Sequence, residues 1–449
     1  MDIKCITTVW YNDKAVSEQN VCKTIHDPGI EANVVNLYPE VHYQEFEGFG
    51  GAITEASGYT FLKMGHESRK EIIDAYFGTE GICYSAVRVP VDSCDFSLGN
   101  YSAVNDESDV NLDSFNLERD KQYILPMLFK AQEAAGKRLK IMLSPWSPPA
   151  FMKTNGAKNG GGSLKPEYRE MWARYLCRYV KEYRSMGLNV TMLTVQNEPK
   201  ASQTWDSCIY TAQQEKEFIR DYLYPEMVKN GLEDLELCIW DHNKERVFER
   251  ARDVIDADTG KMVKGVAFHW YSGDHFDAVR VVREKYPDKK LIFSEGCVEY
   301  SKFSAKDQLR SAQMYAHDIL GNLNAGMNLS LDWNILLDER GGPNHVGNYC
   351  DAPLMANTKN DTVEKKLSYT YIGHFSRYIK PGAFRIASTV YTDRLETTAF
   401  RNPDGTIACV LLNGTESDLP VNLRICGQFA YMLIPRESIT TLIITDKKI

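Results

Sequence analysis

The sequence predicts an α/β protein: a (β/α)8 TIM barrel with an accessory antiparallel β-sandwich built from both chain ends. Three observations support this prediction. Eight short apolar runs occupy the middle of the chain, helical patterns separate them, and the last part of the chain is rich in β-type sequence. The 449 residues suffice for a large core and an accessory domain.

The eight apolar runs are typical of parallel strands in a sheet that is covered on both faces. Most of them are apolar almost without a break, as strands with no solvent-facing side should be. An open doubly wound sheet is the structural alternative, but no GxGxxG motif follows an early strand. The runs span residues 45–51, 84–90, 138–144, 190–196, 235–241, 265–271, 290–296 and 326–333.

Segments with helical spacing lie between the apolar runs. Residues 166–187 show this spacing and end in Gly187, a typical helix terminator. Residues 211–231 begin with Thr211, which is suited to cap a helix, and end in Gly231. The last barrel helix is expected within residues 365–379. Alternating strands and helices of this kind predict the barrel.

The pattern changes after Pro381 to short β-rich runs with turns at "NPDG" and "NGTESD". The first 40 residues are also strand-like and lack a helical pattern. Because chain ends often lie close together, both ends are expected to join one sandwich. We therefore expect N-terminal sandwich strands in residues 1–42, the barrel in 43–378 and the C-terminal sandwich in 379–449.

The composition argues against several classes of partner. Lys and Arg number 52 against 61 Asp and Glu, so the net charge is −9 and no basic surface for nucleic acid is expected. No apolar run reaches the roughly 18 residues of a membrane span, so we expect no stable membrane insertion. The N-terminus lacks a signal-peptide pattern and the 11 cysteines form no CxxC pair, which favours a cytoplasmic location. A chain trimmed of its signal would instead be secreted, and the sequence makes no prediction about oligomeric state.

Two glutamates stand out among the polar residues at strand ends, where the chemistry of such barrels takes place. Glu198 follows the fourth run and Glu295 ends the seventh, so the two carboxyl groups can face each other across the barrel mouth. A retaining glycosidase needs two carboxyl groups about 5–5.5 Å apart, one as nucleophile and one as general acid/base. The acid must keep its proton near neutral pH, which burial beside a negative partner favours.

Neighbouring residues suit a sugar ligand. Asn197 can bind a sugar 2-hydroxyl, a contact that strengthens in the transition state. Flat apolar faces for a pyranose ring are expected from Trp146, Trp270, Tyr271 and Trp333.

Other polar residues have structural alternatives. Arg88 is either part of the site or a structural partner of Glu55 or Asp95. Asp241 and His242 are adjacent ligand types, but neighbours in a strand point to opposite faces. We therefore expect no catalytic metal, and we also expect no cofactor.

Motifs along almost the whole chain resemble glycoside hydrolase family 30, and more closely its glucosylceramidase-like branch. They occur in the family's order: "GFGGAITEA", "RVPVDSCDFS", "SPWSPPAF", "QNEP", "FHWY", "FSEGCV", "DWN", "GGPNHVGN" and "GHFSRYIKPG". So many ordered matches make the resemblance specific, whereas "NEP" alone recurs across the wider clan of retaining barrel glycosidases.

The resemblance implies that Glu198 is the acid/base and Glu295 the nucleophile of an exo-β-glucosidase acting on β-glucosides. A β-xylosidase or β-1,6-glucanase using the same site is the alternative, and a non-catalytic sugar-binding protein is a third. The resemblance also implies substrate-binding roles for eight residues. These are Asp95, Trp146, Asn197, Trp333 and Asn348 around the sugar, with Arg88, His269 and Tyr271 lining the site and orienting the carboxyl groups.

Overall fold

Eight parallel strands close into a barrel in the computed structural model, which describes residues 1–445. The last barrel strand pairs with the first, which closes the ring and excludes the open sheet. All eight lie within or beside the predicted runs. In chain order they are β5 (Gly48–Ala52), β6 (Ala86–Val91), β7 (Lys140–Pro145), β8 (Val190–Thr194), β9 (Glu236–Asn243), β10 (Val263–His269), β11 (Lys290–Glu295) and β12 (Leu329–Asp332).

Apolar side chains fill the barrel interior, so polar groups gather above it at the strand ends. Gly50 of β5 lets this strand approach β6 closely, because a Cβ there would lie 1.9 Å from the backbone oxygen of Ala86. The interior side chains come from the other seven strands: Ala86, Met142, Met192, Cys238, Ala267, Ile292, Leu329 and Leu331.

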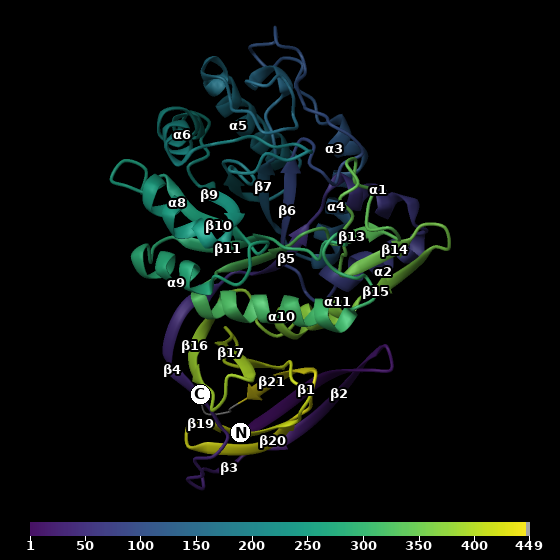
Figure 1. Ribbon diagram of the computed structural model, residues 1–449, viewed down its shortest axis with the longest axis vertical. Coiled ribbons are helices and arrows are strands. Elements are labelled where there is room, and N and C mark those ends of the chain that lie inside the picture. Colours follow the sequence, from purple (N-terminus) through teal and green to yellow (C-terminus); the bar gives the residue numbers. More distant parts are fainter. Residues whose placement is uncertain (446–449) are drawn as a thin grey trace.

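Helices surround the barrel, as Figure 1 shows. In α5 (Arg169–Ser185), Trp172, Leu176, Tyr179 and Tyr183 recur at helical spacing and are all buried. Eight further helices are α1 (Glu55–Lys63), α2 (His66–Phe77), α3 (Glu118–Gln122), α4 (Ile124–Ala135), α8 (Val247–Val254), α9 (Phe276–Lys285), α10 (Gln308–Ala325) and α11 (Leu367–Ser376). Short 3-10 turns span Ala150–Met152, Pro166–Tyr168 and Lys244–Arg246.

The helix predicted for residues 211–231 is interrupted. It begins with the predicted cap. Thr211 Oγ1 accepts from the Gln214 N–H at 3.1 Å, and Gln214 Oε1 in turn accepts from the Thr211 N–H. α6 (Ala212–Phe218) then widens into a π-turn (Ile219–Leu223) before α7 (Tyr224–Lys229). Pro225 explains the interruption, because proline lacks the N–H of a regular helix and its ring clashes with the preceding turn.

Ten strands of the two chain ends form the accessory sheet structure. β1 pairs antiparallel with β21, which confirms that the N-terminal strands join the C-terminal ones. One pair departs from the predicted antiparallel pattern, because β4 and β19 run parallel. The strands are β1 (Asp2–Tyr11), β2 (Lys14–Lys23), β3 (Ile25–His26), β4 (Val34–Phe46), β16 (Ala383–Thr389), β17 (Leu395–Arg401), β18 (Ile407–Asn413), β19 (Leu419–Ile425), β20 (Gln428–Ile434) and β21 (Ser438–Thr445).

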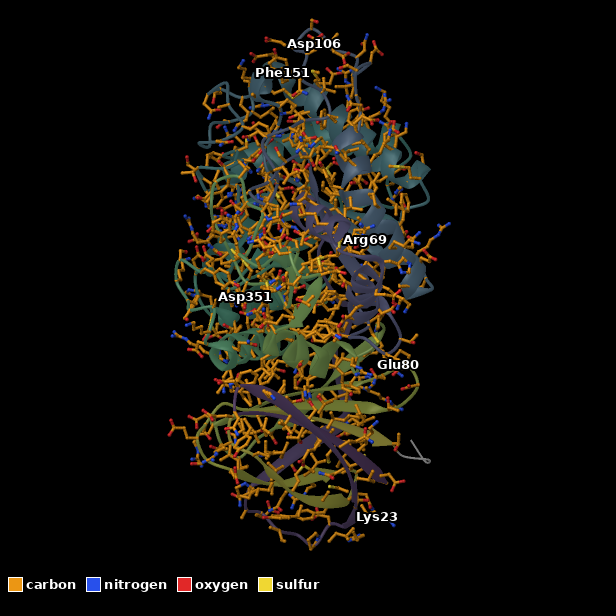
Figure 2. All side chains as sticks on the ribbon, turned by 90° about the vertical axis from the view of Figure 1, so that its right-hand side faces the viewer. Lys23, Arg69, Glu80, Asp106, Phe151 and Asp351 are labelled. Atoms are coloured by element: carbon orange, nitrogen blue, oxygen red, sulfur yellow. The ribbon has the colours of Figure 1, made fainter. Side chains whose placement is uncertain are left out.

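The sandwich lies against one side of the barrel, next to α10 and α11 (Figure 1). Asn324 of α10 donates to the backbone oxygen of Thr397 in β17 at 2.9 Å. Figure 2 shows Lys23 near the sandwich end of the molecule and Asp106 and Phe151 at the opposite end. The domain bounds 1–42, 43–378 and 379–449 stay a prediction.

A small third sheet lies between β12 and α11 in the chain. It consists of β13 (Leu336–Asp338), β14 (Leu354–Asn357) and β15 (Thr362–Lys365). Among the helices of residues 1–445, none combines the length and hydrophobicity that crossing a bilayer requires.

Candidate active site

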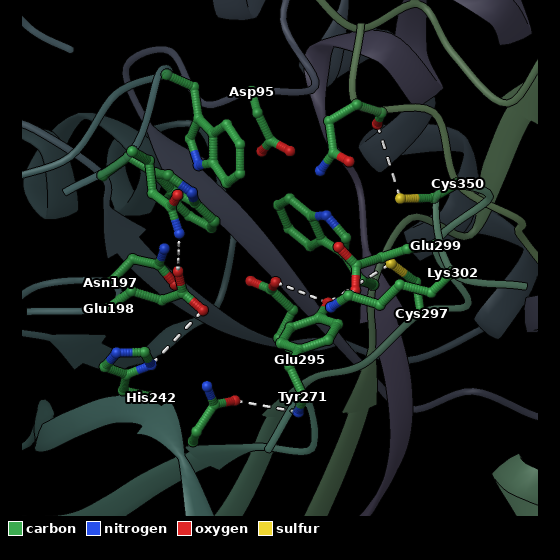
Figure 3. A pocket seen from close by; sticks show the side chains of 16 residues that line it. Asp95, Asn197, Glu198, His242, Tyr271, Glu295, Cys297, Glu299, Lys302 and Cys350 are labelled. Carbon is green, nitrogen blue, oxygen red and sulfur yellow. Dashed lines mark hydrogen bonds and ion pairs between the residues drawn. The ribbon is translucent and has the colours of Figure 1, made fainter. Parts of the chain in front are cut away.

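A cavity of about 250 Å³ lies at the carboxyl ends of the barrel strands (Figure 3). Two predicted site residues, Arg88 and His269, are fully buried beneath it and reach the carboxyl groups from below. The other eight predicted site residues all line the cavity: Asp95, Trp146, Asn197, Glu198, Tyr271, Glu295, Trp333 and Asn348.

Glu198 projects from a sharp turn that follows β8. The backbone N–H of Glu198 donates to the oxygen of Asp241 at 2.9 Å, and that of Asn197 donates to the oxygen of Pro145 at 2.8 Å. Glu198 has a φ of +45°, a left-handed conformation that is unfavourable for a residue with a side chain. Such strain is typical of functional sites, where the surrounding bonds hold the residue in place.

Glu295, the last residue of β11, has a donor on each carboxylate oxygen. Arg88 Nη1 donates to Oε2 at 2.6 Å, and the hydroxyl of Tyr271 donates to Oε1 at 3.0 Å. These two bonds fix the orientation of the carboxylate and stabilise its charged form. Figure 3 shows the carboxyl groups of Glu198 and Glu295 facing into the same cavity.

Arg88 ties several strand ends together beneath the cavity. Besides Glu295, it donates to Asn197 Oδ1 and Asp241 Oδ2, both at 2.8 Å, and to Ser144 Oγ at 3.0 Å. The alternative that Arg88 pairs with Glu55 or Asp95 is therefore wrong. Arg119 is the partner of Glu55, which frees Arg88 for the site.

The side chain of Glu198 lies among three polar neighbours. His269 Nδ1 is 3.4 Å from Glu198 Oε1, and Gln203 Nε2 donates to Oε2 at 3.4 Å. His242 Nδ1 lies 3.6 Å from the same Oε1. The other nitrogen of His269 contacts Asp241 Oδ1 at 3.0 Å.

The contact between Glu198 and His269 shifts the pKa values of the two groups in opposite directions. Burial raises the pKa of Glu198, but the hydrogen bond to His269 and the nearby imidazoles outweigh it and lower the pKa to about 2. Burial lowers the pKa of His269, yet its acidic neighbours raise it to about 9. Burial raises the pKa of Glu295, and the negative charge of Glu198 raises it further. The positive charges of His269 and Arg88 lower it, but the net shift is upward. Burial thus favours a proton on Glu198 while the neighbouring imidazoles oppose it, and the protonation of Glu198 stays a prediction.

The end of β9 also differs from the prediction. Ala267 of β10 pairs with Trp240 and Phe268 pairs with His242, so Asp241 is an extra residue in the ladder. Trp240 and Asp241 have φ values of +72° and +53°. This bulge breaks the alternation of side chains. Asp241 therefore bonds to Arg88 beneath the cavity while the adjacent His242 lines it, which a regular strand would not allow.

Three of the four predicted aromatic platforms line the cavity. Trp146 and Trp333 stack with ring centroids 5.1 Å apart, and the Arg88 guanidinium lies 4.7 Å from the Trp146 ring centroid. Trp270 is the exception, because it packs outside the barrel against Tyr315 with a centroid distance of 4.9 Å. Side chains alternate at this point, so His269 and Tyr271 point inward and Trp270 points outward.

Asp95 lies in the loop after β6, where Asn344 Nδ2 donates to its Oδ2 at 3.3 Å. Burial raises the pKa of Asp95 well above its usual range, and the charges of Glu295, Asp206 and Glu198 add to this effect. A carboxyl group kept neutral in this way can donate a hydrogen bond to a ligand oxygen.

Sequence reasoning did not assign eight further residues that line the cavity. They come mainly from loops whose paths local patterns do not reveal, and only His242 carried a signal, as a polar residue at a strand end. These residues are Gln203, Trp205, His242, Asn243, Cys297, Glu299, Lys302 and Cys350. Glu299 and Lys302 form an ion pair on this wall.

Comparison with known proteins agrees with this architecture. The model of the glycosyl hydrolase family 30 TIM-barrel domain matches residues 46–379, and that of the family's beta sandwich domain matches residues 382–442. SrfJ from Salmonella typhimurium has a crystal structure with a TM-score of 0.96 and 36% identity, with 100% of both chains covered.

Two further relatives are named for their activities. Lysosomal acid glucosylceramidase of Mus musculus is 32% identical over 408 residues, which are 87% of this chain and 79% of that protein. The structure of the endo-β1,6-glucanase BT3312 has a TM-score of 0.87 and 26% identity, covering 98% of this chain and 99% of that one. The chain therefore belongs to glycosyl hydrolase family 30, a family of glycoside hydrolases.

Proposed function

We propose that the protein is a retaining exo-β-glucosidase of the glucosylceramidase-like type. The observation that carries this proposal is the pair Glu198 and Glu295, which line one cavity at the ends of β8 and β11. The cavity volume of about 250 Å³ lies below the roughly 300–1,000 Å³ of sites for drug-sized ligands. A small pocket of this kind suits one terminal sugar, which supports removal of end residues.

In the proposed reaction, Glu295 attacks the anomeric carbon while Glu198 protonates the leaving oxygen. The bond between the anomeric carbon and the leaving oxygen breaks as the bond to Glu295 forms, giving a covalent glycosyl-enzyme. Glu198 then takes a proton from water, which attacks the same carbon and releases the sugar and Glu295. Arg88 and Tyr271 orient the nucleophile through their bonds to its two oxygens.

The proposed sugar contacts follow from the same cavity wall. Asn197 is held by Arg88 beside Glu198, which suits a bond to the 2-hydroxyl. Asp95 and Asn348 offer polar groups to the other hydroxyls, and the indoles of Trp146 and Trp333 offer apolar surface.

Azide rescue tests which glutamate has which role. A 2,4-dinitrophenyl β-glucoside needs no acid for its leaving group, so Glu198→Ala should still form the glycosyl-enzyme and stall there. Azide should then restore turnover and give the β-glucosyl azide. Glu295→Ala should be inactive alone. With azide it should give the α-glucosyl azide, because azide then displaces the leaving group directly and this single displacement inverts the anomeric carbon. Reversed products would exchange the two roles, and near wild-type activity of Glu295→Ala would refute the mechanism.

A β-1,6-glucanase is the second candidate, because BT3312 is an endo-β1,6-glucanase with a closely similar fold. Aryl β-glucoside, β-xyloside, β-fucoside and β-galactoside, together with glucosylceramide and β-1,6-glucan, separate the possibilities. Release of glucose alone would support the exo-glucosidase, and release of oligosaccharides from β-1,6-glucan would support the glucanase. Preference for the xyloside would support the β-xylosidase. A β-glycoside is the proposed partner, and a cytoplasmic location stays a prediction.

A further inference from the structure

Three potential metal ligands meet at the edge of the cavity. The carboxylate of Glu198 and one ring nitrogen each of His242 and His269 lie within 4.8 Å of one another. His269 Nδ1 and His242 Nδ1 are 3.4 Å and 3.6 Å from Glu198 Oε1. Figure 3 shows the contact between His242 and Glu198 on the cavity wall.

These spacings fit a tetrahedral zinc site. Zn²⁺ binds histidine nitrogen and carboxylate oxygen at about 2.0–2.1 Å, so two ligands of one tetrahedral ion lie about 3.3–3.4 Å apart. The two distances in this cluster come within a few tenths of an ångström of that value. The third spacing, between the two imidazole nitrogens, is at most 4.8 Å, so the imidazoles can reach one ion by closing toward each other.

Two further observations point to a ligand at this place. His242 Nδ1 is shielded from solvent, has no hydrogen-bond partner among the described residues and lies 3.6 Å from Glu198 Oε1, so this nitrogen is not engaged elsewhere. The Nε2 atom of His269 contacts Asp241 at 3.0 Å, which directs Nδ1 toward Glu198. A carboxylate that holds the second nitrogen of a histidine is the usual support of a metal-binding imidazole.

We propose that Glu198, His242 and His269 form an inhibitory site for Zn²⁺ and related transition-metal ions. The ion coordinates the carboxylate of Glu198 and displaces any proton on His269 Nδ1, since metal ligands bind in their deprotonated forms. Glu198 can then neither donate nor accept a proton. The fourth coordination position is left to water, as in other sites with three protein ligands. Inhibition rests on the proposed role of Glu198, whereas metal binding does not.

Isothermal titration calorimetry with ZnCl₂ on the whole, chelator-treated protein tests the site directly. Wild type should bind one equivalent tightly, and His242→Asn should bind it at least tenfold more weakly. His66→Asn is the matched control, because the side chain of His66 is 89% exposed and remote from the cluster. Equal affinity of His242→Asn and wild type, or no stoichiometric binding by wild type, would overturn the proposal.

Two further readouts keep the test decisive. The visible absorption of bound Co²⁺ should report a tetrahedral site in wild type, and this signal should be lost in His242→Gln as well as in His242→Asn. Both variants should keep the circular dichroism of wild type. Zn²⁺ should inhibit aryl β-glucoside hydrolysis by wild type and should inhibit His242→Asn at least tenfold less potently. Binding without inhibition would refute the inhibitory role, and binding remains measurable even if the protein hydrolyses no glucoside.

Discussion

Arg88 shows how single residues build this site. A fully buried guanidinium is costly unless its donors are satisfied, and Arg88 meets this condition with Glu295, Asp241, Asn197 and Ser144. The same bonds place a carboxylate and an amide at the cavity surface. The residue that neutralises the buried acids therefore also orients the groups that would act on a sugar.

Replacement of Tyr271 by Phe should slow catalysis through the orientation of Glu295. The substitution removes the 3.0 Å bond to Glu295 Oε1 and keeps the ring. A hydrogen bond to a charged group contributes about 1.5–3 kcal/mol, so kcat should fall roughly 10–100-fold. Steady-state kinetics on an aryl β-glucoside checks this. Tyr11→Phe is the control, since Tyr11 is 66% exposed in the sandwich, and an unchanged kcat in Tyr271→Phe would contradict the proposed role.

Secondary-structure elements position these residues by where they end. β8 ends at Thr194, and the turn that follows carries Glu198 in its left-handed conformation. β9 ends in a bulge that turns both Asp241 and His242 toward the site. The helices behind the strands contribute through packing rather than through residues in the site. Their caps and packed faces hold the strand ends in place.

The cap of α6 offers a test at this scale. Thr211→Ala should destabilise the protein by about 1 kcal/mol, because it removes the side-chain bond to the Gln214 N–H. Thr211→Ser keeps the hydroxyl and should be close to wild type. The urea midpoint measures the difference. Activity should be unchanged in both variants, and equal midpoints for Thr211→Ala and Thr211→Ser would show that the cap contributes little.

At the scale of the whole molecule, the barrel and the sandwich are joined by a contact with buried polar groups. His374 of α11 lies buried in this contact, 2.8 Å from the hydroxyl oxygens of both Thr8 and Thr441. Thr441 also donates to the backbone oxygen of His374. Nδ1 of His374 therefore donates to Thr441, and in the neutral ring Nε2 accepts from the Thr8 hydroxyl.

Acid should weaken this contact. Burial, aided by Arg377, lowers the pKa of His374 to about 3, below the roughly 6.5 of an exposed histidine. The folded state thus binds this proton less readily than the unfolded state. The stabilising effect of the neutral ring is complete above about pH 6.5 and is lost as the pH falls toward about 3.

His374→Gln should be less stable than wild type at pH 8, because it loses at least one buried hydrogen bond. The difference should shrink as the pH falls from about 6.5 to about 4, since only wild type must protonate the imidazole. Thermal unfolding at several pH values measures this. His66→Gln serves as the exposed control, and a difference that does not vary with pH would contradict the account.

Much of the fold was predictable, because its signals are local. The near-continuous apolar runs identified all eight barrel strands, and Thr211 marked the start of its helix. The widening of that helix before Pro225 was not predicted. The position of a proline does not reveal how the helix adjusts to the missing backbone N–H. The parallel pairing of β4 with β19 was missed because it joins distant segments.

The site also contains features that the sequence predicted and features that it did not. The positions of Glu198 and Glu295 were predictable because each lies at the end of a recognisable strand, and the barrel brings strand ends together. The orientation of Trp270 followed from alternation along β10, but residue type suggested a platform. The pairing of Arg88 was not predictable, because its choice among several acids depends on distances across the barrel.

The sequence by itself determined the number and order of the barrel strands, the joining of both ends in a sandwich, and the two glutamates at strand ends. Periodicity and strand-end position are local properties, so the chain carries them without its fold. Only the tertiary structure decided that a bulge brings Asp241 and His242 to one site and that His269 lies 3.4 Å from Glu198. Those features arise from burial and from charges on separate strands, which interact only after the barrel has closed.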